Sequence, residues 1–396
     1  MQQLSIYGGK PIRSSYLSYG KQWIDEEDIN TVVNVLKGDY LTTGPNVDEF
    51  ERRVAEYVGT KYAVAVSNGT AGLHVACLAA DIKEGDEVIV SSITFAASSN
   101  CVLYCGGTPV FADIDPKSYN IDPENIEELI TEKTKAIVAV DYTGQPVDID
   151  RIMEIAKKHN LIVIEDGAHS LGSEYKGKKV GSKADMTMFS FHPVKPITTA
   201  EGGVVVTNDE KLYNKLRLFR SHGIEKNREN IKADMPSWYH EQQLLGYNYR
   251  LTDIQAALGS SQMNKLEKFI TRRRKIAQKY NEAFRDLEEI NIPYQEEFGN
   301  SGWHLYVITL NLDKLSVDRD IIFDALQKEN IGVNLHYIPV YLHPYYQELG
   351  YKAGSCPNAE EFYNRVITIP LFPKMTDEDV QDVIDAVQKV INYYRR

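Results

Sequence analysis

A lysine between two prolines is the feature of this sequence that most suggests chemistry. Lys195 lies in the segment SFHPVKPITTAEGG, residues 190–203, which follows the strand-like run MTMFSF and leads through a glycine pair into a further strand-like run. The prolines stiffen the backbone around the lysine, and the glycines allow the chain to pass close by. Most lysines are solvated surface charges, but a desolvated lysine has a lowered pKa and can act as an amine nucleophile that forms a Schiff base.

A carboxylate follows a second buried-strand pattern. Asp166 ends the run LIVIED, at the edge where α/β sheets bind their ligands. A buried carboxylate is costly unless it is paired or used, although an aspartate in this position can also cap a following helix. His169 comes three residues later and is close enough to contact the same ligand.

A third pattern favours a phosphate site. The segment SNGTAGLHVACLAA passes directly from a strand into a helix, so the free N–H groups of Gly69, Thr70 and Ala71 would lie at the positive end of that helix. Capping of the helix by Ser67 or Asn68 explains the same residues equally well.

Together these patterns fit one cofactor. Ser190 precedes Lys195 by five residues, emerges from the same predicted strand and is well placed to hydrogen-bond a phosphate. Pyridoxal phosphate requires a Schiff-base lysine, a carboxylate facing its pyridinium nitrogen, and a phosphate site of this kind.

Short β-rich runs separated by helical patterns must position these residues. We expect an α/β fold with a large domain, residues 1–250, built on a mainly parallel seven-stranded sheet, and a smaller C-terminal α/β domain, residues 251–396. Only about ten residues join the last two runs, so one of them is expected to be antiparallel. The segment from 251 to 287 predicts one long amphipathic helix that bridges the domains. The runs are residues 62–67, 86–92, 108–115, 136–141, 161–166, 186–191 and 202–208.

Composition and charge restrict the partners. The 396 residues carry a formal net charge of −12, which disfavours binding to nucleic acid or an anionic membrane. We expect a cytoplasmic protein because no signal or membrane-spanning pattern is present, and no metal site because the four cysteines form no CxxC pair. The segment GSEYKGKK ends in lysine where a P-loop needs Ser or Thr, so it predicts a turn between short strands.

With these residues in view, the chain resembles the DegT/DnrJ/EryC1/StrS family of sugar aminotransferases, a branch of fold-type I pyridoxal-phosphate enzymes. The resemblance covers nearly the whole chain. It is carried by SNGTAGLHVA, VIVSSITFAASSN, VIEDGAHSLGSEYKGKKVG, FSFHPVKPITTAEGGVVVTND, LRLFRSHG, GYNYRLTDIQAALGSSQ and NLHYIPVYLHPYY. SFHPVKPITTAEGG and RSHG resemble especially the branch that aminates a UDP-4-keto sugar on the way to pseudaminic acid.

The resemblance implies a role for each site residue. Lys195 would hold the cofactor as a Schiff base, Asp166 would pair with the pyridine nitrogen, His169 would lie near O3′, and Phe95 would stack on the ring. The resemblance places Gly69, Thr70, Ala71 and Ser190 around the phosphate, joined by Asn248 from the second subunit of a homodimer with shared active sites. The residues implied at the sugar-nucleotide site are Tyr19, Leu41, Thr42, Arg250, His336 and Tyr337; for Tyr337, simple core packing competes with this role.

The implied reaction transfers the amino group of L-glutamate to C4 of UDP-2-acetamido-2,6-dideoxy-β-L-arabino-hex-4-ulose, with pyridoxamine phosphate formed between the two halves. The main alternative is amination of another nucleotide 4-keto-6-deoxy sugar, of the bacillosamine or perosamine type. Pyridoxamine-dependent sugar dehydratases of the family carry histidine in place of the lysine, so Lys195 disfavours that activity, and His192 is interpreted as structural. A regulatory role would predict an added DNA-binding or membrane segment.

Overall fold

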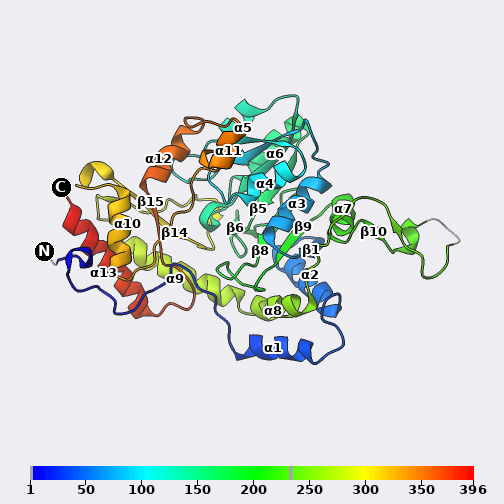
Figure 1. Ribbon diagram of the computed structural model, residues 1–396, viewed down its shortest axis with the longest axis horizontal. Coiled ribbons are helices and arrows are strands. Elements are labelled where there is room, and N and C mark those ends of the chain that lie inside the picture. The colour runs from blue at the N-terminus through cyan, green and yellow to red at the C-terminus, as the bar shows by residue number, and fades with distance from the viewer. Residues whose placement is uncertain (1–2, 232–234) are drawn as a thin grey trace.

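A seven-stranded sheet forms the centre of the molecule in the computed structural model, which describes residues 3–231 and 235–396 (Figure 1). Its strand order is β1-β9-β8-β5-β4-β2-β3. The strands are β1 (Tyr62–Val66), β2 (Glu87–Ser91), β3 (Thr108–Ala112), β4 (Thr134–Val140), β5 (Ile162–Asp166), β8 (Met186–Ser190) and β9 (Gly203–Thr207). Each of the seven runs predicted from the sequence forms one strand of this sheet.

The sheet is parallel from β3 to β8, and β9 runs antiparallel to both of its neighbours, β8 and β1. The expected α/β fold with a mainly parallel sheet is therefore confirmed, including one antiparallel strand at its short connection. Because β4, β5 and β8 run in the same direction, their carboxyl ends meet at one edge. Asp166 and Ser190 are the last residues of β5 and β8, so the topology brings them to this common edge.

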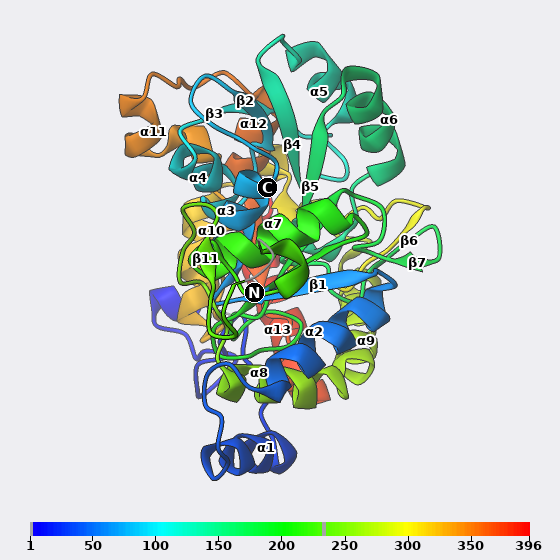
Figure 2. The ribbon, with the colours of Figure 1, turned by 90° about the vertical axis from the view of Figure 1, so that its right-hand side faces the viewer.

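Helices cover both faces of the sheet, which is why its strands are apolar along their whole length. One face packs on α3 (Gly69–Ala79), α4 (Ala97–Tyr104) and α7 (Glu210–Arg220). The other face packs on α5 (Pro123–Leu129), α6 (Ile149–His159) and α2 (Pro45–Val58). Figure 2 shows α5 and α6 on one side of β4 and β5 and α4 on the opposite side of the molecule.

A second apolar cluster lies around a small antiparallel sheet of β12 (Ile290–Asn291), β14 (Tyr306–Leu310) and β15 (Val366–Ile369). Helices α10 (Arg319–Lys328) and α13 (Asp377–Tyr394) pack on it. Leu4 and Leu17 belong to the same cluster, so the first residues of the chain lie among the last ones. Helices α11 (Pro344–Glu348) and α12 (Pro357–Arg365) instead contribute Tyr346, Ala359 and Phe362 to the cluster of the central sheet.

The prediction of one long bridging helix is wrong. The segment forms α8 (Asp253–Met263) and α9 (Leu266–Phe284), with a break at Asn264 and Lys265. The Lys265 ammonium contacts Asp28 at 2.9 Å and Asp25 at 2.5 Å, both at the start of α1 (Glu26–Leu36). The break lets α8 pack on α1 and α2 while α9 reaches α13, so tertiary contacts override an uninterrupted helical pattern. The division of domains near residue 250 stays a prediction.

Three short antiparallel strand pairings complete the fold. Strands β6 (Glu174–Tyr175) and β7 (Lys178–Lys179) pair antiparallel through a turn in which Lys176 and Gly177 have positive φ, as the GSEYKGKK segment predicted. Strand β13 (Gly299–Asn300) pairs with β6, and β10 (Ile224–Glu225) pairs with β11 (Glu241–Gln242). The segment around β10 projects from the body of the molecule (Figure 1). Within residues 3–231 and 235–396, none of the helices has the length and apolar composition needed to cross a bilayer.

Candidate active site

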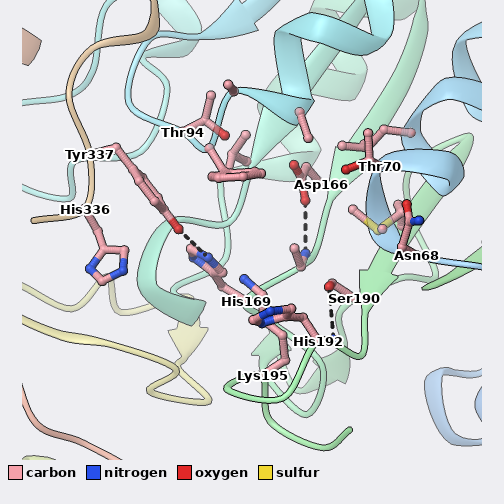
Figure 3. Close-up of a pocket in the computed structure, with 18 of the residues that line it drawn as sticks. Asn68, Thr70, Thr94, Asp166, His169, Ser190, His192, Lys195, His336 and Tyr337 are labelled. Carbon is pink, nitrogen blue, oxygen red and sulfur yellow. Dashed lines mark hydrogen bonds between the residues drawn. The ribbon is translucent and has the colours of Figure 1, made fainter. Parts of the chain in front are cut away.

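A cavity of about 1030 Å³ lies at the carboxyl edge of the central sheet. Its walls come from the start of α3, the loop before α4, the segment around Lys195, and residues 334–338. Figure 3 shows Asn68, Thr70 and Asp166 on one side and His336 and Tyr337 on the other, with His169 and Lys195 between them. The predicted site residues that line the cavity are Tyr19, Gly69, Thr70, Ala71, Phe95, Asp166, His169, Ser190, Lys195, His336 and Tyr337.

The start of α3 forms one end of the cavity. The side chain of Asn68 accepts a hydrogen bond from the Ala71 N–H at 2.8 Å, so the predicted cap is present. Gly69 and Thr70, the first residues of the helix, line the cavity beside that cap. A Cβ on Gly69 would lie 3.2 Å from the Cβ of Ser190, which places this serine directly against the helix start. The cap is therefore present, and the helix N-terminus beside it faces the cavity.

The glycine pair after Lys195 serves this packing. A Cβ added to Gly203 would approach the carbonyl oxygen of Asn68 to 2.7 Å and the nitrogen of Gly69 to 3.0 Å. Real Cβ atoms do not tolerate such contacts, so only glycine lets β9 run this close to the start of α3.

Asp166 is buried at the inner wall of the cavity, with 4% of its surface exposed. One carboxylate oxygen accepts the Ala168 N–H at 3.1 Å, and the other accepts the hydroxyl of Ser98 at 2.6 Å. Turns rather than a helix follow β5, so Asp166 is not a helix cap. Burial raises the pKa of Asp166, which the bonds from Ser98 and Ala168 and the charge of Lys195 partly oppose. Among the described residues, this carboxylate has no salt-bridge partner.

Lys195 reaches the same space from the loop between β8 and β9. Loss of hydration lowers the pKa of this amine to about 8, and the charge of Asp166 acts in the opposite direction. With this pKa, roughly a fifth of the amine is neutral near physiological pH, far more than for an ordinary lysine, and the neutral form acts as a nucleophile or base.

The contacts of His169 fix the position of its proton. The backbone N–H of Thr143 donates to Nδ1 at 3.3 Å, and Nε2 lies 3.2 Å from the hydroxyl of Tyr337. Burial lowers the pKa of His169 well below its usual value, with Lys195 and His336 adding to the effect, so the ring is neutral. Because Nδ1 accepts, Nε2 carries the single proton and donates it to Tyr337. The tyrosine hydroxyl then keeps its own proton at the cavity wall.

Two further histidines complete this wall. His336 contacts the hydroxyl of Thr368 through Nδ1 at 2.8 Å, and burial, aided by Lys195, lowers its pKa to about 3. Burial also lowers the pKa of His304 well below the usual value, with contributions from Lys195 and His169. All three imidazoles around Lys195 are therefore neutral at physiological pH, which leaves the lysine without a competing positive charge among them.

The residues of the cavity fit pyridoxal phosphate. A buried carboxylate without a salt-bridge partner can accept a protonated ring nitrogen, and the helix start with Ser190 can accept a phosphate. Phe95 lines the cavity with 62% of its surface exposed, which is unusual for a large aromatic side chain and provides a face for an aromatic ring.

Four predicted site residues lie outside this cavity. Leu41 and Thr42 are exposed between α1 and α2, Asn248 is exposed beside Ser221, and Arg250 bridges to β1. None of the four lines the cavity formed by the single chain. His192 is exposed at the cavity edge, where its backbone N–H approaches the Ser190 hydroxyl at 3.5 Å.

Sequence reasoning missed several residues of the site. Thr94, His304 and Asn334 line the cavity, and Ser98 binds Asp166 from behind. Thr94 and Ser98 flank Phe95 in the segment TFAASSN, and their spacing of one helical turn was an available signal. His304 and Asn334 lie in otherwise apolar segments, and nothing in the local pattern of those segments points to the cavity.

Comparison with known proteins gives a consistent result. SpsC of Bacillus subtilis, a spore coat polysaccharide biosynthesis protein, is 42% identical over 96% of this chain and 98% of its own length. The structure of Helicobacter pylori PseC, an aminotransferase involved in the biosynthesis of pseudoaminic acid, is 36% identical with a TM-score of 0.89, covering 96% of this chain and all of that one.

A third relative has been solved with cofactor. The putative sugar aminotransferase Spr1654 of Streptococcus pneumoniae, in its pyridoxamine-phosphate form, is 33% identical with a TM-score of 0.89 over 95% of this chain and 99% of its own. Its pyridoxal-phosphate form is also similar, with a TM-score of 0.88 at 32% identity over 96% of this chain and 99% of that one. The family model for DegT/DnrJ/EryC1/StrS aminotransferases matches residues 22–388. This chain therefore belongs to the DegT/DnrJ/EryC1/StrS aminotransferase family, and it is a pyridoxal-phosphate-dependent sugar aminotransferase.

Proposed function

We propose that this protein transfers the amino group of L-glutamate to C4 of UDP-2-acetamido-2,6-dideoxy-β-L-arabino-hex-4-ulose, giving a UDP-4-amino sugar for pseudaminic acid biosynthesis. The observation that carries the aminotransferase chemistry is the convergence of Lys195, Asp166 and the start of α3 on one cavity. The similarity to PseC supports the choice of sugar.

Bound pyridoxal phosphate supplies the electron sink and carries the amino group between the two substrates. In this proposal Gly69, Thr70, Ala71 and Ser190 hold the phosphate, and Phe95 covers one face of the ring. Asp166 holds a proton on the ring nitrogen, because an ionised carboxylate stabilises the cationic nitrogen beside it.

Lys195 moves the protons. With its pKa lowered to about 8, its amine takes a proton from Cα of glutamate in the first half of the reaction. In the second half it delivers a proton to C4 of the sugar. A single amine can perform both transfers because the two substrates occupy the same cavity in turn.

His169 and Tyr337 act as a pair in this proposal. The Nε2–H of His169 fixes the tyrosine oxygen, and the hydroxyl proton points to a ligand oxygen. Burial raises the pKa of Tyr337 above its usual value, and Asp166 and Tyr19 add to the effect, so the hydroxyl remains a donor throughout the working pH range.

The cavity of one chain is poor in cations for a substrate with a diphosphate. Lys195 is the one lysine or arginine among the described residues that line it. We propose that a homodimer supplies the missing groups, with Asn248 and Arg250 of one subunit reaching the site of the other, and Leu41 and Thr42 at the same junction. Both Asn248 and Leu41 are exposed in the single chain, as this arrangement requires.

The identity of the preferred sugar substrate is tested with a panel of nucleotide sugars. The purified holoenzyme is incubated with glutamate and with UDP- and dTDP-linked 4-keto-6-deoxy sugars, and each product is identified by NMR. We expect the L-arabino UDP sugar to give the highest kcat/KM. A higher value for another sugar would overturn the assignment to pseudaminic acid while leaving the aminotransferase chemistry intact.

The second candidate is amination of another nucleotide 4-keto-6-deoxy sugar, for example one of the bacillosamine or perosamine type. The higher identity to SpsC than to PseC favours keeping this candidate in the panel. The same experiment decides between them, because the two candidates differ only in which sugar is turned over fastest.

A further inference from the structure

A chain of two hydroxyl groups lies behind Asp166, outside the set of residues assigned above. Ser98, in the first turn of α4, has its Oγ 2.6 Å from Oδ2 of Asp166. The hydroxyl of Thr94 lies 2.6 Å from the same Ser98 oxygen. Both side chains are buried, with Ser98 fully inaccessible and Thr94 2% exposed, so bulk water does not compete for these bonds.

The direction of these hydrogen bonds follows from counting the available hydroxyl protons. Ser98 has one hydroxyl proton, and its possible acceptors are Asp166 at 2.6 Å, the Thr94 hydroxyl at 2.6 Å and the Phe95 carbonyl at 3.2 Å. Asp166 is the one charged acceptor of the three and forms the strongest bond, so the proton goes to Asp166. The contact between Thr94 and Ser98 is then made by the proton of Thr94, because that of Ser98 is already used. The bonds run from Thr94 to Ser98 to Asp166.

We propose that Ser98 and Thr94 are positioning residues that keep the Asp166 carboxylate ionised and aimed at the ring nitrogen of the cofactor. This inference rests on the role proposed for Asp166. A bond from Ser98 stabilises the charged form of a buried carboxylate, and Thr94 fixes the rotamer in which Ser98 can donate. The Ala168 N–H holds the other oxygen at 3.1 Å, so the carboxylate is restrained at both ends.

The geometry of α4 supplies a matched control. Ser99 is the next residue, is equally inaccessible, and contacts the hydroxyl of Tyr346 at 2.6 Å rather than Asp166. Ser99→Ala thus removes one buried hydroxyl from the same helical turn without touching the carboxylate. Any general effect of such a deletion on α4 appears in both variants.

The test compares two ligands. One is pyridoxamine phosphate, which binds without a covalent link to Lys195, and the other is its analogue with carbon in place of the ring nitrogen. Dissociation constants are measured by calorimetry for full-length apoenzyme. Ser98→Ala should raise the dissociation constant of pyridoxamine phosphate roughly 10-fold or more, the usual range for a lost bond to a charged group. The dissociation constant of the carbon analogue should change less than about 2-fold. Thr94→Val should show the same selectivity with a smaller effect, Thr94→Ser should restore wild-type binding, and Ser99→Ala should show no selectivity.

Asp166→Asn tests the proposed role of Asp166 separately from that of the two hydroxyl groups. If this variant loses the preference for the nitrogen-containing ligand and Ser98→Ala keeps it, Asp166 has the proposed role and the hydroxyl chain does not support it. If Asp166→Asn itself keeps the preference, the proposed role of Asp166 is wrong. Equal losses for both ligands in Ser98→Ala would mean that Ser98 is merely structural, and would overturn the inference. If Ser98→Ala fails to fold, as judged by its thermal transition, the Thr94 variants make the same comparison.

Discussion

The hydroxyl of Tyr337 lies 3.2 Å from Nε2 of His169, and the neutral histidine donates in that contact because its Nδ1 accepts the Thr143 N–H. Because Nε2 of His169 already carries a proton, it cannot accept the hydroxyl proton of Tyr337. We therefore expect Tyr337 to donate this proton to a bound ligand. We therefore expect Tyr337→Phe to lower kcat/KM about 10- to 100-fold, the value of one bond to a charged or partly charged oxygen, with little change in thermal stability. Steady-state kinetics on the preferred sugar measure this. Tyr345→Phe, at an exposed residue nearby in α11, should have no effect; an equal loss there would contradict the assignment.

Lys195→Ala should lower the transamination rate roughly 10²- to 10⁴-fold, because the base for both proton transfers is removed. Mass spectrometry after borohydride reduction should show covalently attached cofactor on the wild type and none on the variant. Lys178→Ala changes an exposed lysine in the β6–β7 hairpin and serves as the control. Multiple turnovers by Lys195→Ala at the wild-type rate would exclude the lysine as the base.

The lowered pKa of Lys195 predicts a pH dependence for loading of the cofactor. The neutral amine attacks pyridoxal phosphate, so the rate of covalent attachment to apoenzyme should rise with pH and level off above about 8, where the amine is already deprotonated. Stopped-flow absorbance follows the attachment. A rate that continues to rise to pH 10, as for an ordinary lysine, would show that burial does not lower the pKa of this amine.

The three neutral histidines should limit stability in acid. Burial lowers the folded-state pKa of His336 to about 3, whereas an unfolded histidine takes up a proton below about 6.5. The unfolded state therefore binds the extra proton, and stability falls as pH decreases from about 6.5 towards 3. For one such histidine the loss between pH 7 and pH 5 is about 2 kcal/mol.

Urea unfolding of the apoenzyme at these two pH values tests this. His336→Gln should lose less stability than the wild type on acidification, while His240→Gln, at an exposed position, should follow the wild type. Identical pH dependence in all three proteins would contradict the neutral state of His336.

Gly203→Ala should weaken both the fold and the phosphate site, because its Cβ would lie 2.7 Å from the carbonyl oxygen of Asn68. Overpacking of this kind costs about 1–3 kcal/mol. We expect a lower thermal midpoint and a higher dissociation constant for inorganic phosphate. Gly38→Ala, at an exposed glycine whose added Cβ comes no nearer than 3.4 Å to any other atom, should leave both unchanged.

A mixing experiment tests the proposed sharing of sites. Lys195→Ala and Asn248→Ala each impair activity in a homodimer, but a mixed dimer has one site with an intact lysine and an intact partner asparagine. Equal mixing under exchange conditions should restore about a quarter of the wild-type activity. Activity no higher than the mean of the two variants would show that Asn248 does not serve the partner's site.

The features that depend on the local sequence pattern, namely the strands and the residues at their ends, could be predicted from the sequence. Seven apolar runs became the seven strands, and Asp166 and Ser190 were located because strand ends at one edge of a parallel sheet must meet. The break between α8 and α9 was missed because the carboxylates that Lys265 contacts at the break, those of Asp25 and Asp28, lie far away in the sequence. His304 was missed for a similar reason, since only tertiary packing turns this residue of an apolar segment towards Lys195.

The packing of the first residues against the last helix has a consequence for biosynthesis. Leu4 and Leu17 share a core with α13, and the hydroxyl groups of Tyr7 and Tyr394 lie 3.0 Å apart. Because a chain emerges from the ribosome beginning at its N-terminus, these residues meet their partners only after the α13 segment has been synthesised. Tyr19 lies in the cavity wall, and its carbonyl oxygen accepts the N–H of Leu371. This part of the site can therefore be completed only after Leu371 has been synthesised, whereas the central sheet can assemble earlier.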